Sequence, residues 1–289
     1  MVTEFLLLGT PSGRKQNFLN FMVFQQTILG TLLGNLLIVT VNIAEQKLHT
    51  PMYFFLRNLS ILDMCFISIT VPIACINSLT CNRAILVTFY ETRIFSANFS
   101  ACVELLFLSY MAWDRYVNIY QPLQYPIFTN YQLCVHMTLD SLLSGLVYAG
   151  VHTGHTFQLF FPQSNMALHF FCDVPSLLRL SCSDITSNKV LNLLFAVGIC
   201  GDGITIIVTS YICIFSTVLK FPYRASRKAF STCTPHILLL SIFLSSATGV
   251  YLRPSANSET LQDILLSPFY TMFSPFLNPL IFSLRKKQI

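Results

Sequence analysis

Two carboxylic acids lie inside long apolar stretches of the sequence. Asp63 stands within the stretch 53–76 and Glu104 within the stretch 94–113. Because a helix rises about 1.5 Å per residue, the two positions reach a similar depth if both stretches are helices of one bundle. Two carboxylates in a medium of low dielectric constant either share a proton or hold a cation between them. We expect a sodium ion with water at Asp63 and Glu104, and the alternative is a neutral, hydrogen-bonded structural pair.

Two motifs place polar residues at points where helices can move. Asp114-Arg115-Tyr116 follows the stretch 94–113 directly. At a membrane edge, adjacent opposite charges stay solvated and can exchange partners when helices shift. Asn278-Pro279 lies inside another apolar stretch, where proline removes a backbone donor and leaves a carbonyl in need of a partner. We expect a kink there, bridged by Asn278.

Machinery for catalysis is missing from the sequence. It contains no nucleophile–base pair, no zinc-binding His-Glu-x-x-His motif and no glycine-rich phosphate loop. Its ten cysteines include no Cys-x-x-Cys pair, which argues against a zinc site. The net charge of +5 is spread without a long basic run, which argues against nucleic-acid binding. We therefore expect neither an enzyme nor a nucleic-acid partner.

The elements that must position these residues are membrane helices. Only 10% of the 289 residues are charged and 54% are apolar, whereas about a quarter of a soluble domain is charged. A spanning helix needs about 20 mostly apolar residues, and seven stretches qualify. They are 18–41, 53–76, 94–113, 133–154, 190–219, 235–252 and 261–284. We predict an all-α membrane protein, with residues 1–289 forming one seven-helix bundle that contacts lipid.

Positive charge predicts the orientation of the bundle. Lysine and arginine gather in the short loop 220–228 and in the tail 285–287, and such clusters mark the cytosolic side. The N-terminus is then extracellular and the C-terminus cytosolic. Segment 155–189 becomes a long outer loop, of a length that is usually functional or disordered.

Six motifs are spread over the whole chain. They are Gly34-Asn35, LHTPMYFFL at 48–56, MAWDRYV at 111–117, Ser210-Tyr211, KAFSTCTPH at 228–236 and PFLNPLIFSLR at 275–285. Together they resemble the motifs of vertebrate odorant receptors, which are rhodopsin-like G-protein-coupled receptors. The resemblance implies a multi-pass protein of the plasma membrane, in the cilia of olfactory sensory neurons. It would bind small volatile odorants and activate a stimulatory olfactory heterotrimeric G protein, which raises cAMP.

The resemblance also implies where ligand and G protein act. By family position, the outer parts of four helices line an odorant pocket, although each lining residue could equally serve ordinary helix packing. The pocket residues are Ala97, Asn98, Ala101, Cys102, Phe195, Ile199, Ala247, Thr248, Tyr251 and Thr271. The residues implied in activation and G-protein coupling are Asp114, Arg115, Tyr116, Tyr211, Lys228, His236, Asn278 and Pro279.

The outer cysteines depart from the family pattern. By resemblance, two disulfide bridges fix the long loop, but Tyr90 and Pro162 stand where the partners of Cys172 and Cys182 are expected. Losing a bridge typically costs about 2–5 kcal/mol, unless Cys172 and Cys182 pair with each other. The chain is then either a working receptor or a non-signalling relic of one.

A transporter or ion channel is the alternative from another class. Asp63, Glu104, Asp140 and Asp202 could form a relay for protons or ions. This alternative predicts ion flux without a G protein. The sequence shows no internal repeat between its halves, which argues against a duplicated transporter fold.

Overall fold

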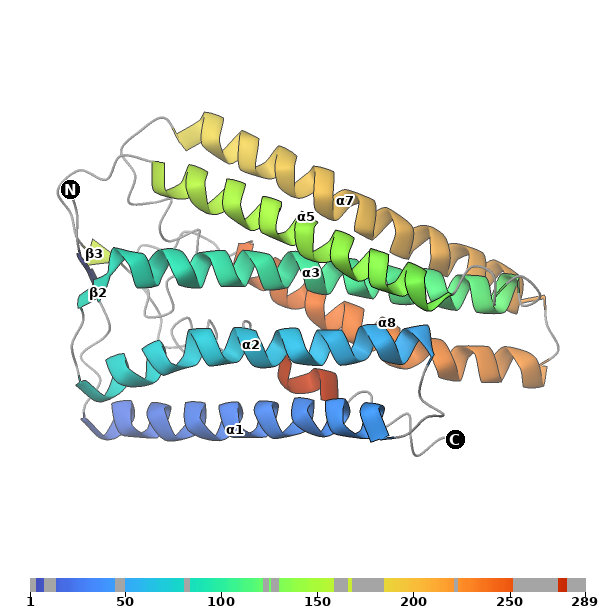
Figure 1. Cartoon of the computed structure of the whole chain (residues 1–289), viewed down its shortest axis with the longest axis horizontal. Coiled ribbons are helices and arrows are strands. Elements are labelled where there is room, and N and C mark those ends of the chain that lie inside the picture. The colour runs from blue at the N-terminus through green and yellow to red at the C-terminus, as the bar shows by residue number, and fades with distance from the viewer. Residues whose placement is uncertain are drawn as a thin grey trace.

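The computed structural model describes six long helices. The described residues are 4–7, 14–44, 50–80, 84–121, 125, 130–158, 166–167, 185–220, 223–251 and 275–279. The helices are α1 (Arg14–Ala44), α2 (Pro51–Thr80), α3 (Val87–Tyr120), α5 (Tyr131–Gln158), α7 (Ile185–Val218) and α8 (Tyr223–Tyr251). Figure 1 shows them running roughly along the longest axis of the molecule. A short helical segment, 275–279, lies against α1 and α2.

The apolar stretches mark these helices but not their ends. The predicted ranges 18–41, 53–76, 94–113 and 133–154 are contained in α1, α2, α3 and α5. α8 begins at Tyr223 and passes through Pro235, whereas the sequence predicted a start at 235. Hydropathy detects only the part of a helix that lies in lipid, while backbone hydrogen bonds continue past the membrane edge. Of the seventh stretch, 261–284, only 275–279 lies within the described residues.

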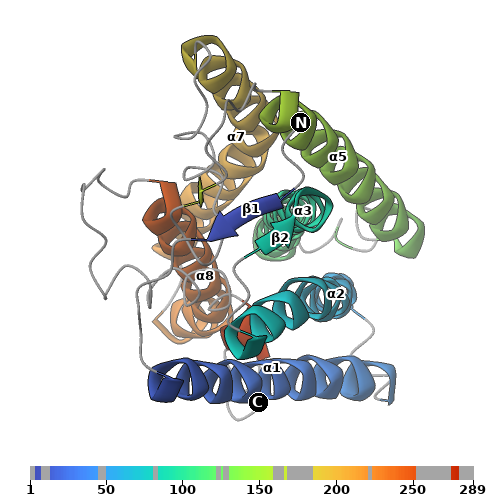
Figure 2. The same ribbon diagram turned by 90° about the vertical axis from the view of Figure 1, so that its left-hand side faces the viewer.

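A small sheet at one end of the bundle was not predicted. It contains β1 (Glu4–Leu7), β2 (Ala84–Leu86) and β3 (Met166–Ala167), in the order β2-β1-β3. β1 pairs antiparallel with β2 and parallel with β3. Figure 2 shows β1 and β2 in front of the end of α3. Strands this short carry no alternating pattern, so the sequence gives no signal for them.

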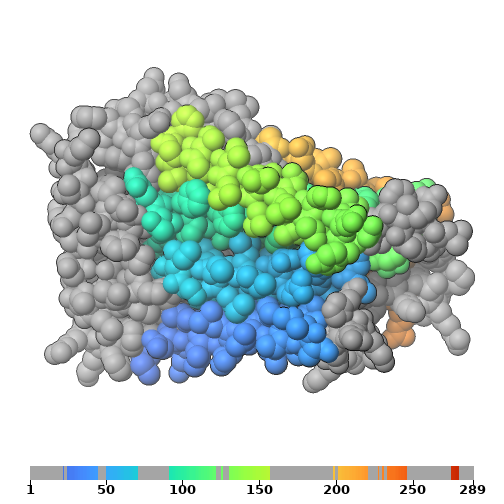
Figure 3. All heavy atoms as spheres, viewed as in Figure 1, coloured from blue at the N-terminus to red at the C-terminus, as the bar shows by residue number. Residues whose placement is uncertain are grey.

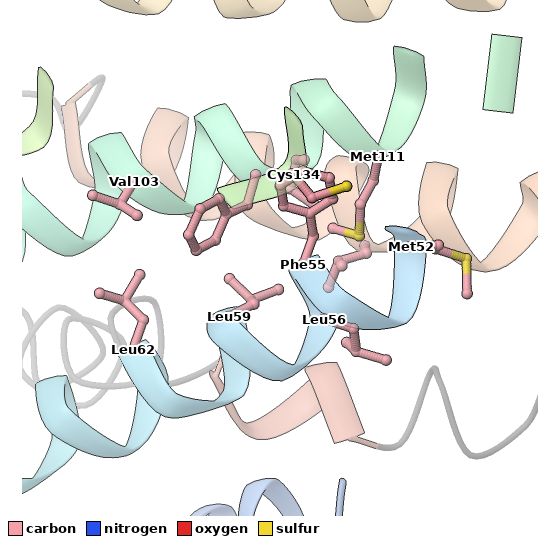
Figure 4. Close-up of a cluster of buried hydrophobic side chains, with 11 residues drawn as sticks. Met52, Phe55, Leu56, Leu59, Leu62, Val103, Met111 and Cys134 are labelled. Atoms are coloured by element: carbon pink, nitrogen blue, oxygen red, sulfur yellow. The ribbon is translucent and has the colours of Figure 1, made fainter. Parts of the chain in front are cut away.

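The core lies between α2 and α3. Phe55, Leu59 and Leu62 are spaced along one face of α2 and pack with Val103 and Met111 of α3. Figure 4 shows Leu59 and Leu62 of α2 on the side facing Val103 of α3. In a membrane this packing stabilises by van der Waals contact, because lipid is as apolar as the side chains.

Large apolar side chains also cover the outside of the bundle. Leu29, Leu33 and Leu37 are exposed along one face of α1, and Ile212 is exposed on α7. Within the described residues, five helices are long and apolar enough to cross a membrane. Ionisable side chains such as Asp63, Glu104 and Arg115 are buried beside the apolar core, while large apolar side chains are exposed. This distribution is expected of a chain surrounded by lipid. The all-α membrane class predicted from the sequence is confirmed.

Candidate functional site

A buried carboxylate and a buried amide join α2 to segment 275–279. Nδ2 of Asn278 donates a hydrogen bond to Oδ2 of Asp63 at 2.7 Å. Both side chains are buried. The sequence predicted that Asn278 would bridge the kink of its own helix, and this prediction is wrong: its amide is directed to another helix.

The carbonyl released by Pro279 has a partner on α1. Proline lacks the N–H that would bond the carbonyl four residues earlier, and that carbonyl belongs to Pro275. Nδ2 of Asn35 donates to the Pro275 oxygen at 3.2 Å and to the Thr31 oxygen at 3.0 Å. A Cβ atom on Gly34 would lie 3.0 Å from the Pro279 ring. A side chain at this position would press against the Pro279 ring, so glycine favours the close approach of segment 275–279 to α1.

Glu104 of α3 faces the same region. Its side chain is buried, and its charge acts on Asp63. The structure therefore brings together the two carboxylates that the sequence singled out. In the described part of the chain, Oδ1 of Asn278 is buried without a hydrogen-bond partner. A carboxylate pair beside such an amide oxygen offers the ligands that a hard cation or an ordered water takes.

The described residues limit which groups could bind a metal ion. No group of three or more histidine, cysteine or acidic side chains suited to a metal occurs among the described residues. Any cation at Asp63 and Glu104 would therefore complete its coordination with amide, hydroxyl or water oxygens.

α3 and α7 are joined by a hydrogen bond from a serine side chain to a backbone oxygen. Oγ of Ser109 donates to the Leu105 oxygen at 2.7 Å and to the Gly203 oxygen at 3.1 Å. A Cβ atom on Gly203 would lie 2.9 Å from Oγ of Ser109. The close approach of the two helices thus depends on glycine at this position. α3 contacts α2, α5, α7 and α8, whereas α1 packs against α2.

The Asp114-Arg115-Tyr116 motif lies at the end of α3 remote from the sheet. Oη of Tyr125 donates to Oδ1 of Asp114 at 3.0 Å. Nη2 of Arg115 lies 2.7 Å from Sδ of Met52 at the start of α2, and thioether sulfur is a weak acceptor. Arg115 is buried, and Tyr116 stacks on Tyr120.

A hydrogen bond joins α7 to α8 in the half of the bundle that contains the Asp114-Arg115-Tyr116 motif. Oη of Tyr211 and Nδ1 of His236 are hydrogen-bonded at 2.5 Å, and their rings stack at 5.9 Å. Both residues are buried. Lys228 lies on α8, but its side chain is outside the described residues. A movement of α8 away from α7 would therefore break the hydrogen bond between Tyr211 and His236.

Among the expected pocket residues, the side chains are described only for those on α3. Nδ2 of Asn98 is hydrogen-bonded to Nδ1 of His152 on α5 at 3.2 Å. Cys102 is buried, Ala97 is partly buried and Ala101 is exposed. The side chains outside the described residues are those of Phe195, Ile199, Ala247, Thr248, Tyr251 and Thr271. The side chain of Asn98 is thus turned to α5.

Three contacting residues were missed by the sequence analysis. His152 is an ionisable residue inside a predicted membrane stretch and should have been singled out on that ground. Met52 belongs to the LHTPMYFFL motif but was not singled out, and Tyr125 lies outside the six motifs; their contacts depend on how the chain around α3 folds. Asp140 has a partner that was not foreseen, since Oη of Tyr110 donates to its Oδ2 at 3.1 Å.

The cysteines of the outer loop remain outside the described residues. Cys172, Cys182 and Pro162 are not described, and Tyr90 lies in α3 with its side chain not described. Cys65, Cys134 and Cys213 in the helices have free thiols. The disulfide predictions therefore stay untested.

The arrangement of these helices is similar to that of a solved membrane protein, squid rhodopsin. Squid rhodopsin superimposes with a TM-score of 0.69, over 94% of this chain and 78% of that one. The two sequences are only 16% identical, so this likeness concerns the fold alone. It shows that the bundle has the fold of rhodopsin.

Sequence comparison identifies the family. Residues 24–289 match the family model described as olfactory receptor. Human olfactory receptor 14C36 is 54% identical over all of this chain and 93% of its own length. Human olfactory receptor 14A16 is 40% identical over all of this chain and 94% of its own length. The chain belongs to the olfactory receptor family.

Membership of this family confirms the resemblance drawn from the six motifs. The chain is a G-protein-coupled receptor rather than an enzyme, and a multi-pass protein of the plasma membrane. The family also decides against the transporter alternative, because Asp63 and Glu104 then belong to a receptor.

Proposed function

We propose that this receptor binds small, largely apolar volatile molecules and activates a stimulatory heterotrimeric G protein. The observation that carries the proposal is the chain of buried contacts from Asn35 through segment 275–279 to Asp63. These groups tie three parts of the chain together by single hydrogen bonds. A ligand that binds better to another arrangement of these helices would shift the population toward that arrangement.

The two ends of the bundle take different roles in this proposal. The end carrying the sheet faces outward and holds the odorant, beside Ala97, Asn98 and Cys102. The opposite end holds Arg115, Tyr211 and His236 and contacts the G protein in the cytosol. The arginine and lysine residues of 220–228 adjoin that end, which supports this orientation by the distribution of positive charge.

Sodium between Asp63 and Glu104 is part of the proposal. Both carboxylates are buried and close enough to interact electrostatically, and Asn278 adds an amide oxygen that has no hydrogen-bond partner among the described residues. A bound cation would favour the arrangement in which these groups stay close together. It would therefore oppose the helix movement that an odorant promotes.

The function is tested by cAMP in cells that express the full chain with olfactory trafficking proteins. A panel of apolar volatile compounds is expected to contain at least one that raises cAMP. Arg115→Ala should abolish that response while leaving surface staining unchanged. A chain that reaches the surface and answers no compound, and whose Arg115→Ala variant has the same basal cAMP, would count against a signalling receptor.

Surface staining separates a receptor from a relic. The unmodified chain is compared with a variant carrying Tyr90→Cys and Pro162→Cys. Unmodified chain at the surface shows that the missing bridges are tolerated. Staining only after both cysteines are restored shows a relic that no longer folds well enough to signal.

A further inference from the structure

α3 borders an open space inside the half of the bundle that carries the sheet. Ala97, Ala101 and Glu104 lie on one stripe of α3, because steps of four and three residues return to the same side of a helix. Glu104 is buried and its charge acts on Asp63 of α2, so this stripe points into the bundle. Ala101 is nevertheless exposed, and Ala97 is only partly buried. The interior is therefore open beside these two small residues.

Asn98 stands at the edge of this space, and its amide is held from α5. It precedes Ala101 by three residues, a spacing at which residues of a helix are neighbours. Figure 3 shows α5, in yellow-green, lying along α3, in blue-green. Nδ2 of Asn98 lies 3.2 Å from Nδ1 of His152 on α5, and both side chains are buried. One end of the amide is thus fixed by a residue of another helix.

The chemistry of this contact determines which end of the amide stays available. An amide nitrogen can only donate, so Nδ1 of His152 accepts and the neutral ring carries its proton on Nε2. The ring is itself held, because the ring of Tyr148 packs against it with centroids 5.8 Å apart. A rotation of the Asn98 side chain would break the contact and leave a buried polar group without its partner, which is costly. The acceptor Oδ1 of Asn98 is therefore left for a partner other than His152.

We infer that Asn98, oriented by His152, selects odorants that carry a hydroxyl group. This inference rests on the odorant pocket proposed above and names the chemical class of its ligand, a small alcohol or phenol. The ligand hydroxyl donates to Oδ1 of Asn98, while its apolar body fills the space beside Ala97 and Ala101. Asn98 contacts the ligand, whereas His152 is a positioning residue that acts through Asn98.

A fixed acceptor discriminates between ligands of the same size and shape. An ether or a ketone offers only acceptors, so it would leave Oδ1 of Asn98 without a partner. A site built to hydrogen-bond a hydroxyl rejects the analogue that lacks it more strongly than an apolar pocket rejects a change of size. A carboxylate would set its negative charge against the carbonyl oxygen, and an ammonium ion would lose its water at a high cost in free energy. The neutral hydroxyl is therefore the group that fits.

Thermal unfolding of the purified full chain tests the ligand class without a G protein. Octanol, phenylethanol and cyclohexylethanol are each compared with their own methyl ethers, and a ligand that binds only the folded state raises the melting temperature. At least one alcohol is expected to raise it at a concentration about tenfold lower than its ether requires. Equal potency of alcohol and ether, or no rise with any compound, overturns the inference. A rise without a cAMP response in cells supports the inference and counts against the proposed signalling.

Variants separate the positioning role of His152 from a structural one. Asn98→Leu and His152→Leu should each remove the preference for the alcohol, a loss of about tenfold in the ratio of alcohol to ether potency. His152→Asn keeps an acceptor close to the place of Nδ1 and should retain the preference. His155→Leu, which removes a histidine three residues further along α5, is the matched control and should retain it too. A His152→Leu variant that melts earlier but keeps the ratio overturns the positioning role. If His152→Leu does not fold, the ratios of Asn98→Leu and His152→Asn decide.

Discussion

The amide of Asn35 lies 3.2 Å from the carbonyl oxygen of Pro275 and replaces the backbone donor that Pro279 lacks. A helix that contains proline inside a membrane must satisfy the released carbonyl from elsewhere. Here the donor comes from α1, far away in sequence. Segment 275–279 is thereby tied to α1 through Asn35 and to α2 through the hydrogen bond of Asn278 with Asp63.

The Asn35 contact predicts a loss of stability. Asn35→Leu should lower the free energy of unfolding by about 1 kcal/mol, because the Pro275 carbonyl is left without its side-chain donor. The measurement is thermal unfolding in detergent, followed by thiol-reactive dye. Thr40→Val on the same helix is the control, since Thr40 bonds only the Leu37 oxygen of its own turn at 3.0 Å. A melting temperature no lower than that of the control would contradict the role of Asn35.

The sodium proposal predicts a salt effect that depends on two carboxylates. Sodium chloride should raise the melting temperature relative to N-methylglucamine chloride at equal ionic strength, since a ligand that binds only the folded state stabilises it. Asp63→Asn and Glu104→Gln should each abolish the difference. Asp202→Asn, an exposed carboxylate on α7, should retain it. The same dependence on sodium in all four proteins would exclude this site.

The Tyr211 and His236 pair predicts coupled mutations. Tyr211→Phe and His236→Leu should each destabilise the bundle, while the double variant loses less than the sum, with a coupling of about 0.5–3 kcal/mol. The contact is buried and links α7 to α8, so either change removes the same hydrogen bond. Ser216→Ala is the comparison, because Ser216 bonds the Ile212 oxygen of its own helix. Its effect should add to that of His236→Leu without coupling.

Close approach of α3 and α5 predicts a steric effect. A Cβ atom on Gly145 would lie 2.5 Å from Cγ2 of Val103, and a β-branched side chain has little freedom to move aside. Gly145→Ala should therefore cost about 1–3 kcal/mol. Gly198→Ala on α7 meets nothing within 4 Å and should leave the melting temperature unchanged or higher. Fluorescence size exclusion after heating compares the two variants, and equal effects would argue against tight packing at Gly145.

The sequence predicted how deep residues lie in the membrane, but it did not predict which residues contact one another across helices. Hydropathy located the helices, and helical rise placed Asp63 and Glu104 at a similar depth, where the structure finds their charges interacting. The donor of Asn278 was assigned to its own helix, although it serves Asp63 on α2. Which amide reaches which carbonyl depends on the helices that adjoin, and the apolar pattern of each helix alone does not contain this information.

The short strands and the buried His152 were not predicted for the same reason, because their contacts join segments that are distant in sequence. β1 is stabilised by partners from two distant segments, so no local pattern announces it. The contact of His152 with Asn98 joins α5 to α3 and required the helices to be placed first. Motif resemblance, by contrast, identified the family correctly, because motifs such as Asp114-Arg115-Tyr116 are local in sequence.

The central position of β1 in the sheet has a consequence for the order in which the protein matures. β1 is synthesised before every described helix, yet its partner β3 comprises Met166–Ala167. Domains form from the N-terminus as the chain emerges, and pairing between distant segments is slow. β1 must therefore wait with one edge unpaired until four helices have left the ribosome. The N-terminal segment completes its structure late, although it is made early.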